Sequence, residues 1–414
     1  MALDHQEPDK VPMDFGSTSV TGISASLVSK LRQALGLDSR APLKVVEPYQ
    51  MLGEVDDELR KALGIDCVGL GGRKNLFGFE NKDWKPWRLF DGTDVLVPGA
   101  FNTDPAPNGD ILMYPEGDKT VPPSGRMPKG GFYFDAIVRQ PSLEDHPLRV
   151  EDNLEEFQPI PDDELKYLER EADRLYKSTE FAIVGSFGGT SFGDIALVPG
   201  LNLKHPKGIR DIEEWYISTV TRRDYVYEVF DRQCEIALKN LEGIRQAVGN
   251  KISVIFVSGT DFGAQTGPFI SPDAYRDLFQ PFHKRVNEWV HKKTTWKTFI
   301  HSCGAVEPLI EDFIASKFDI MNPVQCSAAK MDPTHLKQKY GSRITFWGAG
   351  VDTQGTLPFG TPAQVRKEVK ERIQTFAPGG GFVFNSVHNL QARVPVENAL
   401  EMFKAVEKYR SYKH

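Results

Sequence analysis

The heptapeptide Thr298-Phe-Ile-His-Ser-Cys-Gly304 contains two side chains that can bind a metal ion. An apolar, β-favouring run at residues 296–300 leads into it, and a helical pattern follows. Because side chains alternate along a strand, His301 and Cys303 point the same way. An imidazole nitrogen and a thiolate sulfur at a strand end both suit Zn²⁺. The same pair also fits a core histidine beside a buried free cysteine. The choice between a metal site and ordinary packing therefore depends on the elements that position the two residues.

The composition limits the classes of protein to consider. The chain has 414 residues, of which 40% are hydrophobic and 26% charged, so it is long enough for one large domain or two ordinary ones. Its formal charge of −7 argues against nucleic acid or an anionic membrane as the main partner. Its 4 cysteines are widely spaced, which argues against a disulfide framework. We find no signal-peptide pattern and no run of about 18 apolar residues, and we expect a cytoplasmic location.

Strand and helix patterns alternate regularly after residue 161. Six β-like runs, each followed by a helical pattern, lie at 181–187, 252–257, 296–300, 318–322, 344–347 and 381–384. Such alternation indicates βα units on a parallel sheet. Together with a run at 65–70 and one more strand near the start, they predict a single (β/α)₈ TIM-type barrel over residues 1–414. A doubly wound open sheet is the alternative, but no G-x-G-x-x-G motif follows the first strand.

Residues 71–160 interrupt this alternation. Proline and glycine are dense there, and short β-like runs recur at 95–97, 111–114 and 132–134 between turn-forming segments. We predict a small antiparallel, β-rich insertion within the barrel domain. We expect it to act as a cap, or lid, over the rim and to set substrate choice. Most of its aromatic residues should pack the insertion together, and a few should line the substrate mouth.

The predicted strand ends carry a concentration of reactive side chains. In a barrel, active residues lie where strands end and βα loops begin. At those positions the sequence places Asp261, His301, Cys303, Asn322, Gln325, Cys326, Trp347, Asn385 and His388. Only 9 His and 4 Cys occur in the 414 residues, so two of each on one rim favour a metal site over packing.

We predict that this rim binds Zn²⁺ through His301, Cys303 and Cys326. An open catalytic zinc needs three protein ligands and one exchangeable position, and His388 and Asp261 are the alternatives for the third ligand. Asp261 can instead orient His301 from outside the ligand set or act as a general acid–base.

The other rim residues are assigned to catalysis or to the substrate. We predict catalytic roles for Asp261, Gln325 and His388, and substrate contacts for Asn322, Asn385 and Trp347.

Several segments resemble the uroporphyrinogen decarboxylase superfamily. They are Lys10-Val-Pro-Met-Asp-Phe-Gly16, His301-Ser-Cys-Gly304, Asp319-Ile-Met-Asn-Pro-Val-Gln325, Phe346-Trp-Gly348, Val351-Asp-Thr-Gln354, Pro378-Gly-Gly-Gly-Phe-Val-Phe384 and Pro395-Val-Glu-Asn398. Decarboxylases of that superfamily carry an R-Q-A-G-R motif for substrate carboxylates, whereas this chain has Gly16-Ser-Thr-Ser-Val-Thr-Gly22. Without those guanidinium groups a polycarboxylate tetrapyrrole loses its bidentate partners, so we do not expect decarboxylation of uroporphyrinogen.

The His-x-Cys pattern is similar to that of zinc-dependent corrinoid methyltransferases. The resemblance implies methyl transfer between a small substrate and the cobalt of a corrinoid (cobalamin) on a partner protein. Relatives that act on thiols carry a further zinc cysteine in a P-G-C-G segment, which we match to Pro378-Gly-Gly-Gly381. On that match, this chain lacks one thiolate ligand that the thiol-specific relatives have. Its zinc would therefore be more electrophilic than theirs, which favours an ether oxygen over a thiol.

The long insertion and the Asn322-Pro-Val-Gln325 segment look like those of the methyltransferase components of O-demethylases. The resemblance therefore implies an aromatic methyl ether as substrate, a corrinoid protein as partner, and a homodimer as one option for assembly. A zinc-dependent thiol methyltransferase, a cofactor-free decarboxylase and a metal-dependent sensor are the alternatives. Glycine-rich rim segments at 188–193 and 348–355 would let a flat corrin ring approach the backbone.

Overall fold

The computed structural model describes residues 1–37, 42–103, 105–144, 147–188 and 193–412. Seven strands form one parallel sheet in the order β14-β13-β12-β11-β10-β9-β3. Their bounds are β3 Cys67–Gly71, β9 Ala182–Ser186, β10 Val254–Ser258, β11 Lys297–His301, β12 Ile320–Asn322, β13 Thr345–Trp347 and β14 Phe382–Val383. All seven strands that we predicted individually for the barrel are present.

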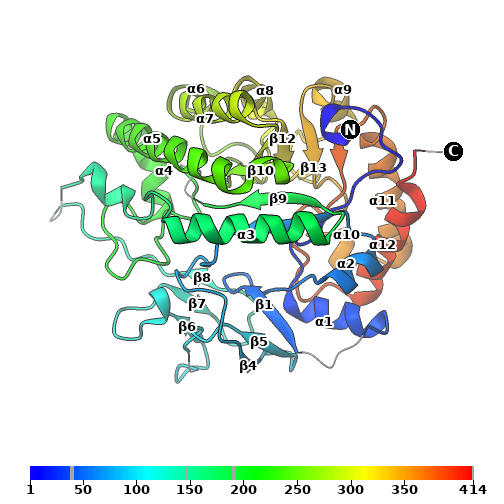
Figure 1. Cartoon of the computed structure of the whole chain (residues 1–414), viewed down its shortest axis with the longest axis horizontal. Coiled ribbons are helices and arrows are strands. Elements are labelled where there is room, and N and C mark those ends of the chain that lie inside the picture. Colours follow the sequence, from blue (N-terminus) through cyan, green and yellow to red (C-terminus); the bar gives the residue numbers. More distant parts are fainter. Residues whose placement is uncertain (38–41, 104, 145–146, 189–192, 413–414) are drawn as a thin grey trace.

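Helices connect the strands and lie around the outside of the sheet (Figure 1). Their bounds are α1 Ala25–Ala34, α2 Asp57–Leu63, α3 Asp162–Ser178, α4 Ile212–Thr221, α5 Arg223–Val248, α6 Pro272–Leu278, α7 Gln280–Lys293, α8 Glu307–Ala315, α9 Pro333–Tyr340, α10 Thr356–Phe359, α11 Pro362–Phe376 and α12 Val396–Tyr409. The helical pattern between the predicted strands at 252–257 and 296–300 is divided into α6 and α7. Pro281 in the first turn of α7 has no amide hydrogen to continue the preceding hydrogen-bond ladder.

A short N-terminal segment closes the barrel between the two edge strands. Met13 pairs in parallel with Phe384, next to β14, and the Asp14 amide donates to the Phe384 carbonyl at 2.9 Å. On the other side, the Asp66 amide donates to the Met13 carbonyl at 2.8 Å, just before β3 begins. The eighth strand that we predicted near the start is therefore this segment, and the TIM-type barrel is confirmed.

The interior of the barrel contains an apolar layer to which each of the seven strands contributes one residue. The layer consists of Cys67, Val184, Val254, Phe299, Ile320, Trp347 and Val383. Residues two positions further along each strand face the same way, so His301 and Asn322 point into the barrel immediately beyond this layer. The layer therefore forms a dry floor beneath the carboxyl ends of the strands, as in other barrels of this kind.

The β-rich insertion leaves the barrel at the carboxyl end of β3 and returns through α3 (Figure 1). Its strands are β4 Lys85–Arg88, β5 Asp94–Val97, β6 Ile111–Met113, β7 Gly125–Met127 and β8 Asp135–Ala136. Together with β1 Leu43–Glu47 and β2 Leu52–Gly53, they form two small sheets, in the orders β2-β1-β5-β4 and β6-β7-β8. Because it begins at a strand's carboxyl end, the insertion starts from the same face of the barrel as His301.

The composition of these sheets corrects two details of the prediction. Strands β1 Leu43–Glu47 and β2 Leu52–Gly53 also belong to them, and β1 pairs with β5 in parallel rather than antiparallel fashion. We call residues 43–53 and 71–136 together the cap. Residues 132–134 are not a strand, because Phe134 is buried against the rings of Phe77 and Phe101 in a separate apolar core.

Membrane insertion finds no support in the described part of the chain. Of the helices given above, none combines the length and the apolar character that crossing a bilayer would require.

The closing segment yields a prediction about stability and pH. Asp14 is fully buried, and burial raises the pKa of its carboxyl to about 6, although hydrogen bonds from Ser17, Thr21 and Trp347 oppose the shift. An unfolded chain has a lower aspartate pKa of about 4, so the folded protein binds this proton more tightly. The stability that the proton contributes is fully present below about pH 4 and is lost as the pH rises through about 6.

We therefore expect the unfolding free energy of the natural protein, minus that of Asp14→Asn, to fall by about 2 kcal/mol between about pH 4 and pH 7. Asparagine cannot titrate, so other pH effects cancel in the difference. Urea unfolding of both proteins across this range measures it. Two stability curves that stay parallel would contradict the assignment.

Candidate metal centre at the carboxyl end of the barrel

Three metal-binding side chains converge at the carboxyl end of the barrel. His301, Cys303 and His388 each offer one ligand atom, and these atoms all lie within 4.8 Å of one another. Cys303 Sγ is 3.4 Å from His301 Nε2, and the two imidazole rings are 5.5 Å apart between centroids. The first two residues lie at the end of β11, and the third lies in the loop between β14 and α12. In the described part of the chain this is the one such group of three His, Cys, Asp or Glu residues.

A hydrogen bond determines which nitrogen of His301 is free. His301 Nδ1 lies 2.6 Å from Asn322 Oδ1, and Asn322 Nδ2 donates to the Trp347 carbonyl at 2.9 Å. A carbonyl oxygen only accepts, so the amide of Asn322 must present its own oxygen to His301. Nδ1 therefore carries the proton and Nε2 keeps its lone pair, which is directed at the cluster.

His388 is held in its neutral form. The pKa of its imidazole is lowered to about 4, mainly by burial, with a contribution from the neighbouring His301 in the same direction and an opposing one from Asp261. At neutral pH the ring therefore carries one proton and has one free lone pair. A neutral imidazole is the form that binds a metal ion.

The Cys303 thiol has no cation that would stabilise its anionic form. Burial raises the pKa of Cys303 well above its ordinary value, and the charge of Asp261 and a hydrogen bond with it raise the pKa further. A divalent cation would reverse this effect, because a thiol that coordinates a metal ion loses its proton. Two imidazoles and one thiolate form a suitable donor set for a catalytic zinc, which uses three protein ligands and one open position.

Asp261 lies at the edge of this cluster. Its Oδ1 accepts a hydrogen bond from the Cys303 amide at 2.7 Å and is 3.6 Å from His301 Nε2. Its backbone carbonyl accepts a hydrogen bond from the hydroxyl of Tyr216, which lies on α4. Of the roles predicted for Asp261, an orienting role from outside the ligand set has direct contacts in its favour, although its hydrogen bond is with the Cys303 amide rather than with His301. A role as acid or base stays a prediction.

The structure places Gln325 and Cys326 differently from each other. Gln325 Oε1 accepts a hydrogen bond from the Gly304 amide at 2.9 Å, so this side chain faces the metal-binding loop. Cys326 is not part of the cluster and packs against the main apolar core. The chain turns at Cys326, whose amide donates to the Val324 carbonyl at 2.9 Å, so the alternation of the strand does not extend to this residue. His388, and not Cys326, is the third side chain of the cluster.

Two of the residues predicted to contact substrate are occupied within the protein. Asn322 is fully buried and uses its amide for His301 and Trp347, so we assign it to positioning His301. Trp347 is 2% exposed, lies in the apolar floor and donates from its indole nitrogen to Asp14 at 3.2 Å. Asn385 donates to the Asp14 carbonyl at 2.6 Å, while its Oδ1 has no partner. Its substrate contact stays a prediction.

Two glycine segments also receive a new interpretation. Pro378-Gly-Gly-Gly381 precedes β14 and therefore lies at the amino end of the barrel, where Gly381 donates to the Ala2 carbonyl at 2.9 Å. It cannot correspond to a ligand segment at the opposite end. In the rim segment 348–355, a Cβ at Gly350 would lie 2.3 Å from the Asn385 carbonyl, so close packing already requires glycine there. Residues 189–192 of the other rim segment lie outside the described residues.

Sequence analysis missed two buried carboxyl groups near the rim. One is Asp14. The other is Asp194, whose Oδ2 accepts from the Gly259 amide at 3.1 Å. Burial raises the pKa of Asp194 to about 6, and the charge of Asp261 adds to the shift. Neither aspartate stands at the end of a predicted strand. The sequence signal was the apolar surroundings of Asp14 in Val11-Pro-Met-Asp-Phe15.

Comparison with known proteins identifies relatives over most of the chain. The profile of the family described as Uroporphyrinogen decarboxylase (URO-D) matches residues 133–409. The uroporphyrinogen decarboxylase of Actinobacillus succinogenes is 31% identical over 93 residues, which are 22% of this chain and 25% of that protein. That of Pseudoalteromonas atlantica is 29% identical over 84 residues, 20% of this chain and 23% of that protein. The chain thus matches about a quarter of the length of these curated relatives.

A solved structure extends the comparison to nearly the whole chain. A methyltransferase from Methanosarcina mazei superposes with a TM-score of 0.53 at 16% sequence identity. The superposition covers 99% of this chain and 96% of that chain. At this level of identity the likeness shows that the two proteins share a fold.

The cluster predicts which cysteine controls metal content. We expect about one zinc per chain in the natural protein and in Cys326→Ala, and close to none in Cys303→Ala, because one variant keeps all three donors and the other loses one. Elemental analysis measures the metal, and thermal unfolding checks the fold. Full metal content in Cys303→Ala would refute the ligand assignment.

The hydrogen bond to His301 predicts a second effect on metal affinity. Asn322→Ala removes the acceptor that keeps the proton on Nδ1, so we expect metal affinity to fall by about 10- to 100-fold. Competition with a chelator measures this affinity. Asn385→Ala serves as the matched control, since it is another buried asparagine at a strand end but bonds to Asp14 rather than to a ligand. Equal losses in both variants would show a general packing effect instead.

Proposed function

The chain belongs to the uroporphyrinogen decarboxylase family, and from that premise we propose that it is a methyltransferase. In the proposed reaction, a methyl group passes from the ether oxygen of a methoxylated aromatic compound to the cobalt of a corrinoid carried by a separate protein. The proposed cofactor of this chain is one zinc ion. The observation that carries the proposal is the convergence of His301, Cys303 and His388 at the carboxyl end of the barrel.

The residues around the cluster have distinct roles in this proposal. His301, Cys303 and His388 hold the metal, and Asn322 accepts a hydrogen bond from Nδ1 of His301, so that Nε2 faces the metal. Gln325 positions the loop by accepting from the Gly304 amide. When bound, zinc would supply a Lewis acid for the ether oxygen, so that a phenolate can leave without a strong acid. The apolar floor beneath the site keeps water away from the reacting atoms.

Decarboxylation of a polycarboxylate is disfavoured by the segment that replaces the arginine-rich motif. Ser17 donates its hydroxyl to Asp14 at 2.7 Å, and the hydroxyls of Thr18 and Thr21 lie 3.1 Å apart. The segment thus satisfies its own polar groups and a buried carboxyl group. It contributes no guanidinium for a substrate carboxylate.

The donor set favours an ether over a thiol as the methyl donor. Two neutral imidazoles and one thiolate leave a divalent zinc with a net charge of about +1, whereas two thiolates would leave it neutral. A more positive metal polarises a hard ether oxygen more strongly. The fold is shared with a protein described as a methyltransferase from Methanosarcina mazei, which supports the general class of reaction.

An exposed apolar patch near the metal centre supports docking of a partner protein. Helix α4 buries Trp215, Ser218 and Thr219 but leaves Ile217 43% and Val220 73% exposed, so its solvent-facing side carries two aliphatic side chains where polar residues are usual. The exposed ring of Phe269 lies 5.3 Å from that of Tyr216, which bonds to the Asp261 backbone. We call Ile217, Val220 and Phe269 the rim patch and propose that the corrinoid protein docks on it. Apolar patches of this kind mark interaction sites.

The activity is tested with zinc-loaded protein, free cob(I)alamin and a panel of methoxylated arenes. We expect methylcobalamin and the corresponding phenol in equal amounts, in the natural protein and in Cys326→Ala but not in Cys303→Ala. Absorbance spectroscopy follows the cobalamin, and chromatography follows the phenol. Zinc-loaded protein that methylates cobalamin only from thioethers would favour the thiol alternative. Metal and arene binding without any transfer would point to a sensor.

The rim patch yields a prediction about the partner. Val220→Glu places a charge where an apolar contact is proposed, so KM for the corrinoid protein should rise by about tenfold or more. Transfer to free cob(I)alamin should not change, because Val220 does not touch the metal ligands. Tyr176→Glu is the matched control, since Tyr176 is 62% exposed but lies in the last turn of α3, at the amino end of the barrel. An unchanged KM in Val220→Glu would move the docking site elsewhere.

A further inference from the structure

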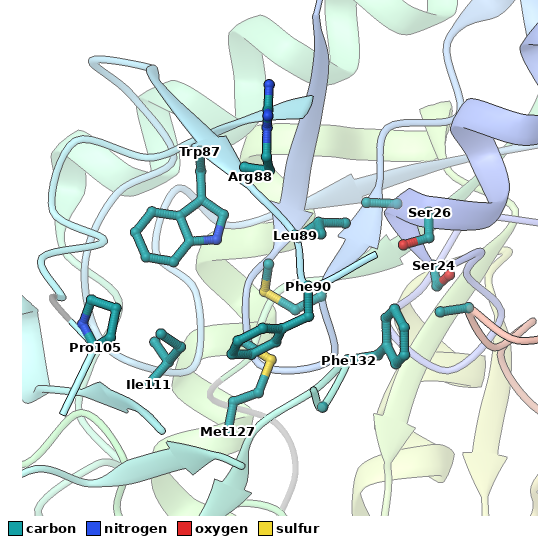
Figure 2. A pocket seen from close by; sticks show the side chains of 14 residues that line it. Ser24, Ser26, Trp87, Arg88, Leu89, Phe90, Pro105, Ile111, Met127 and Phe132 are labelled. Carbon is teal, nitrogen blue, oxygen red and sulfur yellow. The ribbon is translucent and has the colours of Figure 1, made fainter. Parts of the chain in front are cut away.

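A cavity lies between the cap and the amino end of α1 (Figure 2). Its volume is about 260 Å³. The cap supplies most of the wall, and the barrel domain supplies Ser24 to Ser26 and Ala392. None of the three proposed metal ligands lines it, so it is separate from the metal centre.

The wall of this cavity is apolar and largely aromatic. Figure 2 shows the rings of Trp87, Phe90 and Phe132 around the space, with Met127 beside Phe90. Arg88 extends away from the space in the same view and pairs with Asp94 at 2.7 Å. Aromatic walls and thioether side chains favour flat, uncharged rings through stacking and sulfur–ring contacts.

Two serines at the start of α1 also lie in this wall, but both are engaged within the protein. Ser24 caps the helix and accepts a hydrogen bond from the Leu27 amide at 3.4 Å. Ser26 is 1% exposed, and its hydroxyl interacts with the Asp91 carboxylate. A ligand in this cavity would therefore meet an apolar surface rather than a free hydroxyl.

We propose that this cavity binds an uncharged, planar aromatic ring. The size supports this class of ligand, because a cavity of about 150 Å³ is known to hold benzene and drug-sized ligands need about 300 Å³ or more. One or two fused rings therefore fit. The proposal does not depend on methyl transfer.

One loop connects the cavity to the metal centre. Residues 385–395 carry His388 at the metal cluster and Ala392 in the wall of the cavity. The guanidinium of Arg393 lies 5.5 Å from the centre of the Phe132 ring, which also lines the wall. A ring bound in the cavity would therefore contact the segment that positions a metal ligand.

The test uses 2-naphthol, which has no methyl group to transfer, and isothermal titration calorimetry on the whole protein. We expect saturable one-to-one binding, with the same affinity in metal-free Cys303→Ala. Decahydro-2-naphthol has a similar carbon skeleton without a planar ring and should bind at least about tenfold more weakly. Binding that disappears in Cys303→Ala would place the ligand at the metal centre and overturn the proposal.

Variants of the wall locate the ligand. Ala392→Leu adds three carbon atoms to the cavity wall, so affinity should fall by more than about tenfold. Phe90 is 42% exposed, and Phe90→Ala should weaken binding several-fold with little effect on folding. Tyr133→Ala is the control, because Tyr133 is an exposed aromatic residue of the cap outside the cavity. Thermal unfolding checks that each variant is folded.

Each outcome decides between this proposal and the proposed function. Unchanged 2-naphthol affinity in both folded wall variants, or no saturable binding to the natural protein, would reject the cavity as a ring site. Methyl transfer in the natural protein would then still stand. Conversely, intact binding of 2-naphthol in a protein that transfers no methyl group would reject the proposed function and leave the ring site in place.

Discussion

The hydrogen bond between His301 and Asn322 lies at the end of a buried polar chain that begins where the barrel closes. Asp14 on the closing segment accepts from the indole of Trp347, and the Trp347 carbonyl accepts from Asn322, which in turn accepts from His301. Two of these links join the neighbouring strands β11, β12 and β13, and the third joins β13 to the closing segment on the far side of β14. The position of the metal-binding nitrogen therefore depends on correct closure of the barrel, and every group in the chain is fully or almost fully buried.

Burial beneath and around the cluster explains its electrostatic state. The apolar floor removes water from one side, which favours the uncharged forms of His388 and Cys303. A neutral imidazole is ready to bind a metal ion, whereas the thiol must first lose its proton. The carboxylate of Asp261 makes that loss harder in the absence of a cation and supplies compensating charge in its presence. A metal ion bound by these residues would therefore displace the thiol proton.

The cap and the loop at residues 385–395 both line the cavity, and the loop also reaches the candidate metal cluster. The cap has an apolar core of its own, built around Phe77, Phe101 and Phe134. The loop contacts the cap through Arg393 and the cavity wall through Ala392, while its His388 completes the metal cluster. The cap, the wall of the cavity and the candidate metal cluster thus meet in one segment. Loops of this kind carry most functional differences between barrels.

The sequence by itself determined the alternation of strands and helices and the pairing of His301 with Cys303. Both follow from periodicity within one segment: apolar runs predict strands, and residues two apart on a strand share a face. Only the tertiary structure decided the third donor, because Cys326 and His388 lie on different loops. Which of them reaches β11 depends on the path of each loop after its strand. Two further errors of the prediction have the same cause, namely the match of Pro378–Gly381 to a ligand segment and the omission of the cap strands at residues 43–53. The end of the barrel at which a segment lies, and the strand with which it pairs, are set by contacts between residues far apart in the sequence.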